Sequence, residues 1–213
     1  MNFRSFAKQG TGVRHAPMTR IVSLSRKTNE TDIILTVNLD GTGKTAIDTG
    51  VGFFDHMLES FGRHGLLDLE ITVKGDLEID AHHTVEDVGI VLGQAIANAL
   101  GDKRDIQRFG QAAVPMDEAL VEAVIDLSGR AFVAWNVTFE RAMLGEMDTQ
   151  LVEEFFRAFG GNGFFNLHVR QLAGHNAHHV AEASFKAVAR ALRAAVTIEP
   201  RTSGQIPSTK GIL

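Results

Sequence analysis

The chain has 213 residues, of which 44% are hydrophobic and 22% charged, with a formal net charge of −5 and no cysteine. This composition excludes wholesale disorder. The negative charge argues against nucleic acid or an anionic membrane as a partner, because both attract a surplus of Lys and Arg. The absence of cysteine excludes disulfides, thiolate metal sites and a cysteine nucleophile. The longest mainly apolar stretch, residues 88–100, is too short to span a membrane.

Residues 1–18 lack apolar periodicity, and we expect a flexible extension there. Periodicity then predicts a first series of elements: strands at 20–25, 32–39 and 45–47, a helix at 53–61, a strand at 67–74 and a helix at 82–100. A second series follows: strands at 109–116, 119–127 and 131–137, a helix at 148–159, a strand at 164–171 and a helix at 177–196. Asp40-Gly41 indicates a hairpin turn between the second and third strands.

The segment 41–45, Gly-Thr-Gly-Lys-Thr, is similar to the end of a phosphate-binding P-loop. However, Asn38 stands where that motif needs its first glycine, and another extended segment follows where the motif needs a helix. We therefore interpret the segment as a turn.

The two series are related to each other. A shift of 98 residues aligns Phe61 with Phe159 and Gly62 with Gly160, and a shift of 96 aligns the segment 82–86 with 178–182. We interpret this as an internal duplication with halves at about 19–105 and 106–200, followed by a C-terminal arm at 201–213. Because the helices are not interleaved regularly with the strands, the pattern favours an α+β fold over a doubly wound sheet.

His-His-x-x-Glu occurs in both halves, at 82–86 and at 178–182. Residues four apart share a helix face, so His82 and Glu86 can chelate one ion, while His83 points about 100° away. Nitrogen and carboxylate donors without thiolate favour Mn²⁺, Fe²⁺ or Zn²⁺. The 98-residue shift also aligns His56 with Glu154, which makes both of them further candidate ligands.

With these motifs the chain resembles the imidazoleglycerol-phosphate dehydratase family of histidine biosynthesis. The resemblance spans 19–213 and rests on the segments 48–58 (DTGVGFFDHML), 81–87 (AHHTVED), 108–110 (RFG), 126–130 (DLSGR), 174–179 (GHNAHH) and 207–211 (PSTKG). It implies a ribosomal protein S5 domain 2-like fold with helices between two mixed sheets. It also implies a cytoplasmic, monofunctional hydro-lyase that converts imidazole glycerol phosphate to imidazole acetol phosphate through an imidazolate stabilised by two Mn²⁺ per subunit.

The resemblance further implies roles for individual residues. One Mn²⁺ would bind His56, His83, Glu86 and His179, and the other would bind His82, His178, Glu182 and Glu154, although the family often has histidine at the last position. Glu30, His83 and Glu182 would be catalytic, with Glu30 as the base. Substrate and phosphate would contact Glu30, His64, Arg108, Arg130, Lys186, Ser208, Thr209 and Lys210. The family also implies a homo-oligomer of 24 subunits, whereas the sequence alone favours a monomer or dimer.

Two other functions fit the duplicated metal motif. One is a dinuclear metallohydrolase of a phosphorylated small molecule, which would use the metals to activate water. The other is a non-catalytic shell protein whose metals join subunits. The separate basic residues Arg108, Arg130 and Lys210 favour a phosphorylated substrate over either alternative, because arginine and lysine are the residues that bind phosphate.

Overall fold

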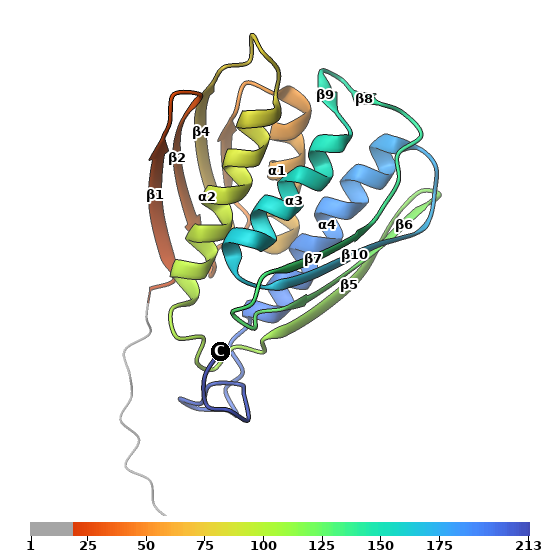
Figure 1. The fold of residues 1–213 in the computed structure, drawn as a ribbon. Coiled ribbons are helices and arrows are strands. Elements are labelled where there is room, and N and C mark those ends of the chain that lie inside the picture. Colours follow the sequence, from red (N-terminus) through yellow and green to blue (C-terminus); the bar gives the residue numbers. More distant parts are fainter. Residues whose placement is uncertain (1–18) are drawn as a thin grey trace, which may run out of the picture.

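The computed structural model describes residues 19–213, and the expected extension at 1–18 lies outside the described residues. Within residues 19–213, four helices form a layer between two four-stranded mixed sheets (Figure 1). The predicted α+β fold with two similar halves is thereby confirmed. None of the helices in this part of the chain is both long and apolar enough to cross a membrane.

The two halves have the same order of elements and the same sheet topology. The first half contains β1 (Ile21–Lys27), β2 (Thr31–Asn38), β3 (Thr45–Asp48), α1 (Gly52–Gly65), β4 (Asp68–Gly75) and α2 (His82–Leu100), with strand order β1-β2-β4-β3. The second half contains β5 (Phe109–Met116), β6 (Ala119–Asp126), β7 (Phe132–Asn136), α3 (Gln150–Gly163), β10 (Asn166–Ala173) and α4 (Ala177–Val196), with strand order β5-β6-β10-β7. A small ladder of β8 (Met143–Leu144) and β9 (Met147–Asp148), which the sequence pattern did not predict, precedes α3.

The hairpin predicted at Asp40-Gly41 is wrong. β4 lies between β2 and β3, antiparallel to the first and parallel to the second. The connection is held at the start of β4, where the carboxylate of Asp68 accepts hydrogen bonds from the backbone N–H groups of Thr42 (2.8 Å) and Lys44 (3.0 Å). A strand follows Lys44, which agrees with the rejection of a P-loop.

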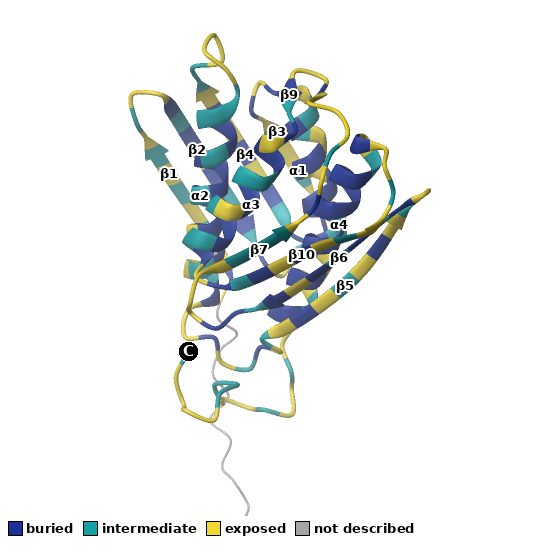
Figure 2. Cartoon of the chain, turned by 45° about the vertical axis from the view of Figure 1, so that its right-hand side comes forward, coloured by how far each residue is buried: buried dark blue, intermediate teal, exposed yellow. Residues whose placement is uncertain are grey.

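Each helix packs against a helix of the other half. Gly89 and Gly93 bring α2 close to α3: a Cβ atom on either residue would lie 2.7 Å from the carbonyl oxygen of Phe155 or 2.5 Å from that of Phe159. α1 packs in the same way along α4, and buried side chains fill the space between helices and sheets (Figure 2). Seven phenylalanines are among the largest fully buried residues. This exchange of partners brings residues of both halves together at the ends of the helices.

Candidate active site

A cluster of potential metal ligands lies where α1 meets α4. The Nε2 atoms of His56 and His178 lie 3.3 and 3.2 Å from Oε2 of Glu182, and the ligand atoms of all three residues lie within 4.8 Å of one another. The side chain of Asn176 caps α4 and accepts hydrogen bonds from the backbone N–H groups of His178 and His179, which fixes the first turn. Two nitrogens and a carboxylate oxygen at these separations suit a divalent ion of the first transition series.

Glu182 is the buried member of this cluster, with a side chain that is 10% exposed. Burial alone would raise its pKa, but the ion pair with Lys186 (2.6 Å) and the hydrogen bond with His56 outweigh burial and hold the pKa below its ordinary value. The carboxylate is therefore ionised near neutral pH, as a ligand must be. Lys186, one turn further along α4, contacts the same cluster.

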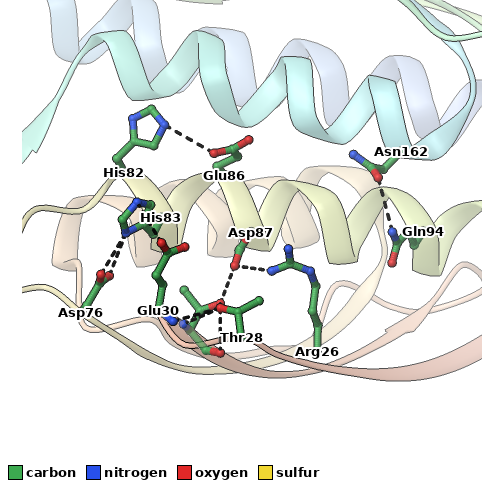
Figure 3. A network of polar contacts seen from close by, with 11 residues as sticks. Arg26, Thr28, Glu30, Asp76, His82, His83, Glu86, Asp87, Gln94 and Asn162 are labelled. Atoms are coloured by element: carbon green, nitrogen blue, oxygen red, sulfur yellow. Dashed lines mark hydrogen bonds and ion pairs between the residues drawn. The ribbon is translucent and has the colours of Figure 1, made fainter.

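A second group of candidate ligands lies on α2. His82 Nε2 is 3.4 Å from Glu86 Oε2, and both side chains point toward α3, whereas His83 points to the other side of the helix (Figure 3). Gly89, one turn after Glu86, packs on the backbone of Phe155, the neighbour of Glu154. Glu154 thus stands on α3 as His56 stands on α1. Next to His82 is a cavity of about 300 Å³ that the β8–β9 segment helps to line.

These contacts differ from the division of ligands that the resemblance implies. His56 lies with His178 and Glu182, two residues from which that division separated it. Likewise, His82 contacts Glu86, which the division assigned to the other ion. The physical reason is the helix pairing: α1 packs on α4, and α2 packs on α3, so within one chain the side chains of one pair meet. How the ligands are divided between two ions stays a prediction.

The second histidine of each motif is oriented by a carboxylate. His83 Nδ1 lies 2.9 Å from Asp76, and His179 Nδ1 lies 2.7 Å from Glu118. These hydrogen bonds raise the pKa of both histidines. The pKa of Glu118 is lowered to about 2 by the bond with His179 and by the backbone N–H of Asn176. Such partners fix the ring and leave Nε2 available for a metal.

The sequence did not indicate Asp76 or Glu118, because neither belongs to a recognisable motif. The duplication nevertheless relates Glu118 to Glu30. Ile21 pairs with Asn38 in the first hairpin, and Phe109 pairs with Asp126 in the second. A shift of 88 residues therefore superimposes the two hairpins and places Glu118 on Glu30.

Glu30 lies at the turn between β1 and β2, with a side chain that is 53% exposed. Its Oε1 is 3.8 Å from His83 Nε2 (Figure 3). Within residues 19–213 its carboxylate accepts no hydrogen bond of normal length, so its oxygens remain available to accept a proton from a bound small molecule.

The basic residues assigned to phosphate divide into two groups. Lys186 contacts Glu182 in the histidine cluster. His64 lies further along the α1–α4 pair, where burial and the charges of Lys186 and Arg190 lower its pKa. The other group lies at the opposite end, where the chain terminates (Figure 1). It consists of Arg108, Arg130, Ser208, Thr209 and Lys210.

Hydrogen bonds hold that second group near the C-terminal end of α4. The backbone N–H of Arg108 donates to Ala195 O (2.9 Å), and its guanidinium binds Asp126 and the carbonyl of Pro207. Gly129, which precedes Arg130, lies against Leu213. Ala195 is seventeen residues after His178 on one helix, which corresponds to about 26 Å. One chain therefore keeps its histidines and these basic residues too far apart for one small substrate.

Comparison with known proteins identifies the family. The statistical model of the imidazoleglycerol-phosphate dehydratase family matches residues 49–192. The imidazoleglycerol-phosphate dehydratase of Acidiphilium cryptum is 67% identical over 196 residues, which are 92% of this chain and 100% of that protein. The dehydratase of Granulibacter bethesdensis is 64% identical with the same coverage.

Solved structures agree with the sequence matches. The crystal structure of the Staphylococcus aureus dehydratase has a TM-score of 0.77 at 39% identity and covers 84% of this chain and 99% of its own. That of the Pyrococcus furiosus enzyme has a TM-score of 0.77 at 35% identity, with 89% and 100% covered. The chain, with its duplicated fold and paired His-His-x-x-Glu helices, belongs to the imidazoleglycerol-phosphate dehydratase family of hydro-lyases.

Proposed function

We propose that this protein dehydrates imidazole glycerol phosphate to imidazole acetol phosphate in histidine biosynthesis, at a site with two Mn²⁺ that is completed by neighbouring copies of the chain. The observation that carries the proposal is the distance, within one chain, between the candidate metal ligands and the basic group of Arg108, Arg130 and the C-terminal arm. A family of hydro-lyases is a poor match for the hydrolase and the shell protein that fitted the motif alone.

The donor set supports a metal of the manganese type. His56, His178 and Glu182 offer two imidazole nitrogens and an oxygen at chelating separation, and His82 and Glu86 offer a further nitrogen and oxygen 3.4 Å apart. The chain has no thiolate to favour a softer metal. Bound at the imidazole ring of the substrate, two such ions would act as Lewis acids and let the ring accept electrons.

Residues of the chain supply the proton transfer. The hydroxyl to be lost is on the carbon attached to the imidazole, and the hydrogen to be removed is on the next carbon, which carries the second hydroxyl. Glu30 accepts this hydrogen as the general base, and the proton and the departing hydroxyl together account for one water. The resulting enol becomes the ketone on that second carbon. The half-exposed carboxylate of Glu30, 3.8 Å from His83, is accessible to a substrate and suits this role.

The phosphate is assigned to the basic residues. Lys186 and His64 would approach it from the chain that carries the metals. Arg108, Arg130 and the arm at 201–213, with Ser208, Thr209 and Lys210, would come from another copy. Arginine binds phosphate through paired hydrogen bonds, and lysine acts as a compact charge. We infer an assembly of 24 subunits, as the family resemblance implies, with His83 and His179 near the contacts between copies.

Two measurements test the proposal. Consumption of imidazole glycerol phosphate should require added Mn²⁺ after chelation, and light scattering should detect a large particle that EDTA breaks into smaller ones, because a ligand that binds the assembled state stabilises it. An active monomer in Mn²⁺ would rule out the shared site. Hydrolysis of phosphoesters without dehydration would instead establish the metallohydrolase.

A further inference from the structure

Asp87 is a buried acid that belongs to neither group of candidate metal ligands. It follows Glu86 on α2, and its side chain is 10% exposed. Its carboxylate accepts a hydrogen bond from the hydroxyl of Thr31 on β2 and forms an ion pair with Arg26 on β1 (Figure 3). One side chain therefore ties both strands of the β1–β2 hairpin to the turn of α2 that carries the candidate ligands.

The turn of this hairpin carries Glu30, and its backbone is well fixed. The hydroxyl of Thr28 accepts hydrogen bonds from the backbone N–H groups of Glu30 (3.1 Å) and Thr31 (3.0 Å). The N–H of Asp76 donates to the carbonyl of Glu30 (3.1 Å). Because the turn is rigid, a displacement of Thr31 relative to α2 would also move the carboxylate of Glu30 away from His83.

The second half of the chain builds the same hairpin without polar anchors. The 88-residue shift that superimposes the hairpins places Val114 on Arg26 and Ala119 on Thr31. The 96-residue shift of the His-His motif places Ala183 on Asp87. Ala119 and Ala183 are buried, so the second hairpin packs on α4 through apolar contacts.

This difference shows that the fold itself does not need the ion pair. Burying a charge is costly unless it is well paired, and apolar replacements of buried ion pairs are often neutral or stabilising. The chain keeps the polar anchor in the half that carries Glu30, the proposed base. In the other half, the equivalent Glu118 binds a histidine instead.

We propose that Asp87 is a positioning residue that, through Thr31 and Arg26, holds the β1–β2 turn so that Glu30 reaches the substrate beside His83. This inference rests on the proposed role of Glu30 as the base. Asp87 itself touches neither metal nor substrate in this account. Its effect should therefore be on turnover, with little change in substrate affinity or metal content.

The test replaces the three anchors by their counterparts from the second half, as Arg26→Val, Thr31→Ala and Asp87→Ala together. We expect the assembled enzyme to keep its Mn²⁺ content and KM, while kcat falls about 100-fold, as a displacement of about 1 Å can cause. The matched control is Lys27→Ala with Asp32→Ala, which removes an exposed ion pair from the same hairpin. This control should retain the activity of the wild-type enzyme.

The decisive arm repeats the triple substitution in a Glu30→Gln background. If Asp87 acts through Glu30, the triple substitution should cause no further loss there. A further fall in kcat of about 100-fold in the Glu30→Gln background would overturn the proposal. So would wild-type kcat in the triple variant, if Glu30→Gln alone is inactive. Unchanged kcat in Glu30→Gln alone would instead refute the role of Glu30 in the proposed function.

A conservative variant covers the case in which the triple variant fails to fold. Asp87→Asn keeps the size of the side chain and an acceptor for Thr31 but loses the charge that binds Arg26. We expect a fall in kcat of about 10-fold with unchanged Mn²⁺ content, and none in the Glu30→Gln background. Wild-type kcat in Asp87→Asn would overturn the proposal.

Discussion

Glu30 and Glu118 occupy equivalent turns in the two halves, yet their surroundings differ. Glu118 is 2.7 Å from His179 Nδ1 and accepts a hydrogen bond from the backbone of Asn176, whereas Glu30 stays 3.8 Å from His83. In the first half it is Asp76 that binds the histidine, and the equivalent position in the second half is Gly174. An extra acid in one half thus relieves Glu30 of the orienting role and leaves it available for proton transfer.

Duplication has preserved the metal-binding pattern and separated the carboxylate roles. Both halves retain two adjacent histidines, a glutamate one turn later and an orienting acid at the ring of the second histidine. A further carboxylate lies beside the second histidine in each half, Glu30 at 3.8 Å from His83 Nε2 and Asp117 at 3.7 Å from His179 Nε2. The first half alone adds the polar anchor of its hairpin. Substitutions at equivalent positions should therefore have different consequences in the two halves.

The largest effect should follow removal of a second histidine from either half. His83→Ala or His179→Ala should abolish turnover, because each change deletes a proposed metal ligand and leaves its orienting carboxylate without a partner. Elemental analysis after purification in Mn²⁺ should show a loss of bound metal. Full metal content together with full activity in either variant would refute the proposed ligand set.

The two glutamates should separate turnover from metal affinity. Glu30→Gln should lower kcat by about 10²- to 10⁴-fold, the usual contribution of a general base, with unchanged Mn²⁺ affinity. Glu118→Gln should weaken Mn²⁺ binding by about 10- to 100-fold, as loss of an orienting partner does, with kcat recovered at high Mn²⁺. Titration of activity with Mn²⁺ distinguishes them, and the same profile in both variants would contradict the division of roles.

The helix pairs should differ in their tolerance of added volume. A Cβ on Gly93 of α2 would lie 2.5 Å from the carbonyl oxygen of Phe159 on α3. A Cβ on Gly65 of α1 would lie 3.5 Å from the carbonyl oxygen of Ala189 on α4. Gly93→Ala should therefore cost about 1–3 kcal/mol of unfolding free energy, the usual range for overpacking. The control is Gly161→Ala on α3, where a Cβ meets nothing within 4 Å and should stabilise slightly. Urea unfolding measures both; equal stability would contradict the close approach.

The smallest effect concerns Arg20, which the 88-residue shift aligns with Arg108. Arg20 binds Asp40 and donates to Val196 O (2.6 Å), and its hydrogen bond holds the pKa of Asp40 below the ordinary value. A lowered pKa stabilises the fold above the unfolded value of about 3.9, and this contribution is lost as pH falls through the folded value. Asp40→Asn should cost less than about 1 kcal/mol at pH 7, because Asp40 is half exposed. The difference from wild type should shrink toward pH 3 in urea titrations; a constant difference would contradict this cause.

Local patterns predicted most elements but not how they combine. The predicted helices at 82–100 and 177–196 match α2 and α4, because apolar residues recur at helical steps and the ends are well marked. The prediction of a hairpin at Asp40-Gly41 was wrong because β4, which is distant in the sequence, pairs with both β2 and β3 and separates them. The His-His-x-x-Glu spacing placed His82 beside Glu86, whereas the contact of His56 with Glu182 needed the packing of α1 on α4. Orienting carboxylates such as Asp76 are set by tertiary contacts alone.

The most direct test of the shared site is complementation between two inactive variants. One carries His56→Ala at the histidine end, and the other carries Arg130→Ala with Lys210→Ala at the opposite end. Co-expressed with different tags and purified through both, mixed assemblies should recover about one quarter of the wild-type kcat. A shared site is active only if one chain supplies an intact His56 and the other chain supplies intact Arg130 and Lys210, and random mixing meets each condition in about half of the sites. Activity no higher than that of either parent would contradict a site built from two copies.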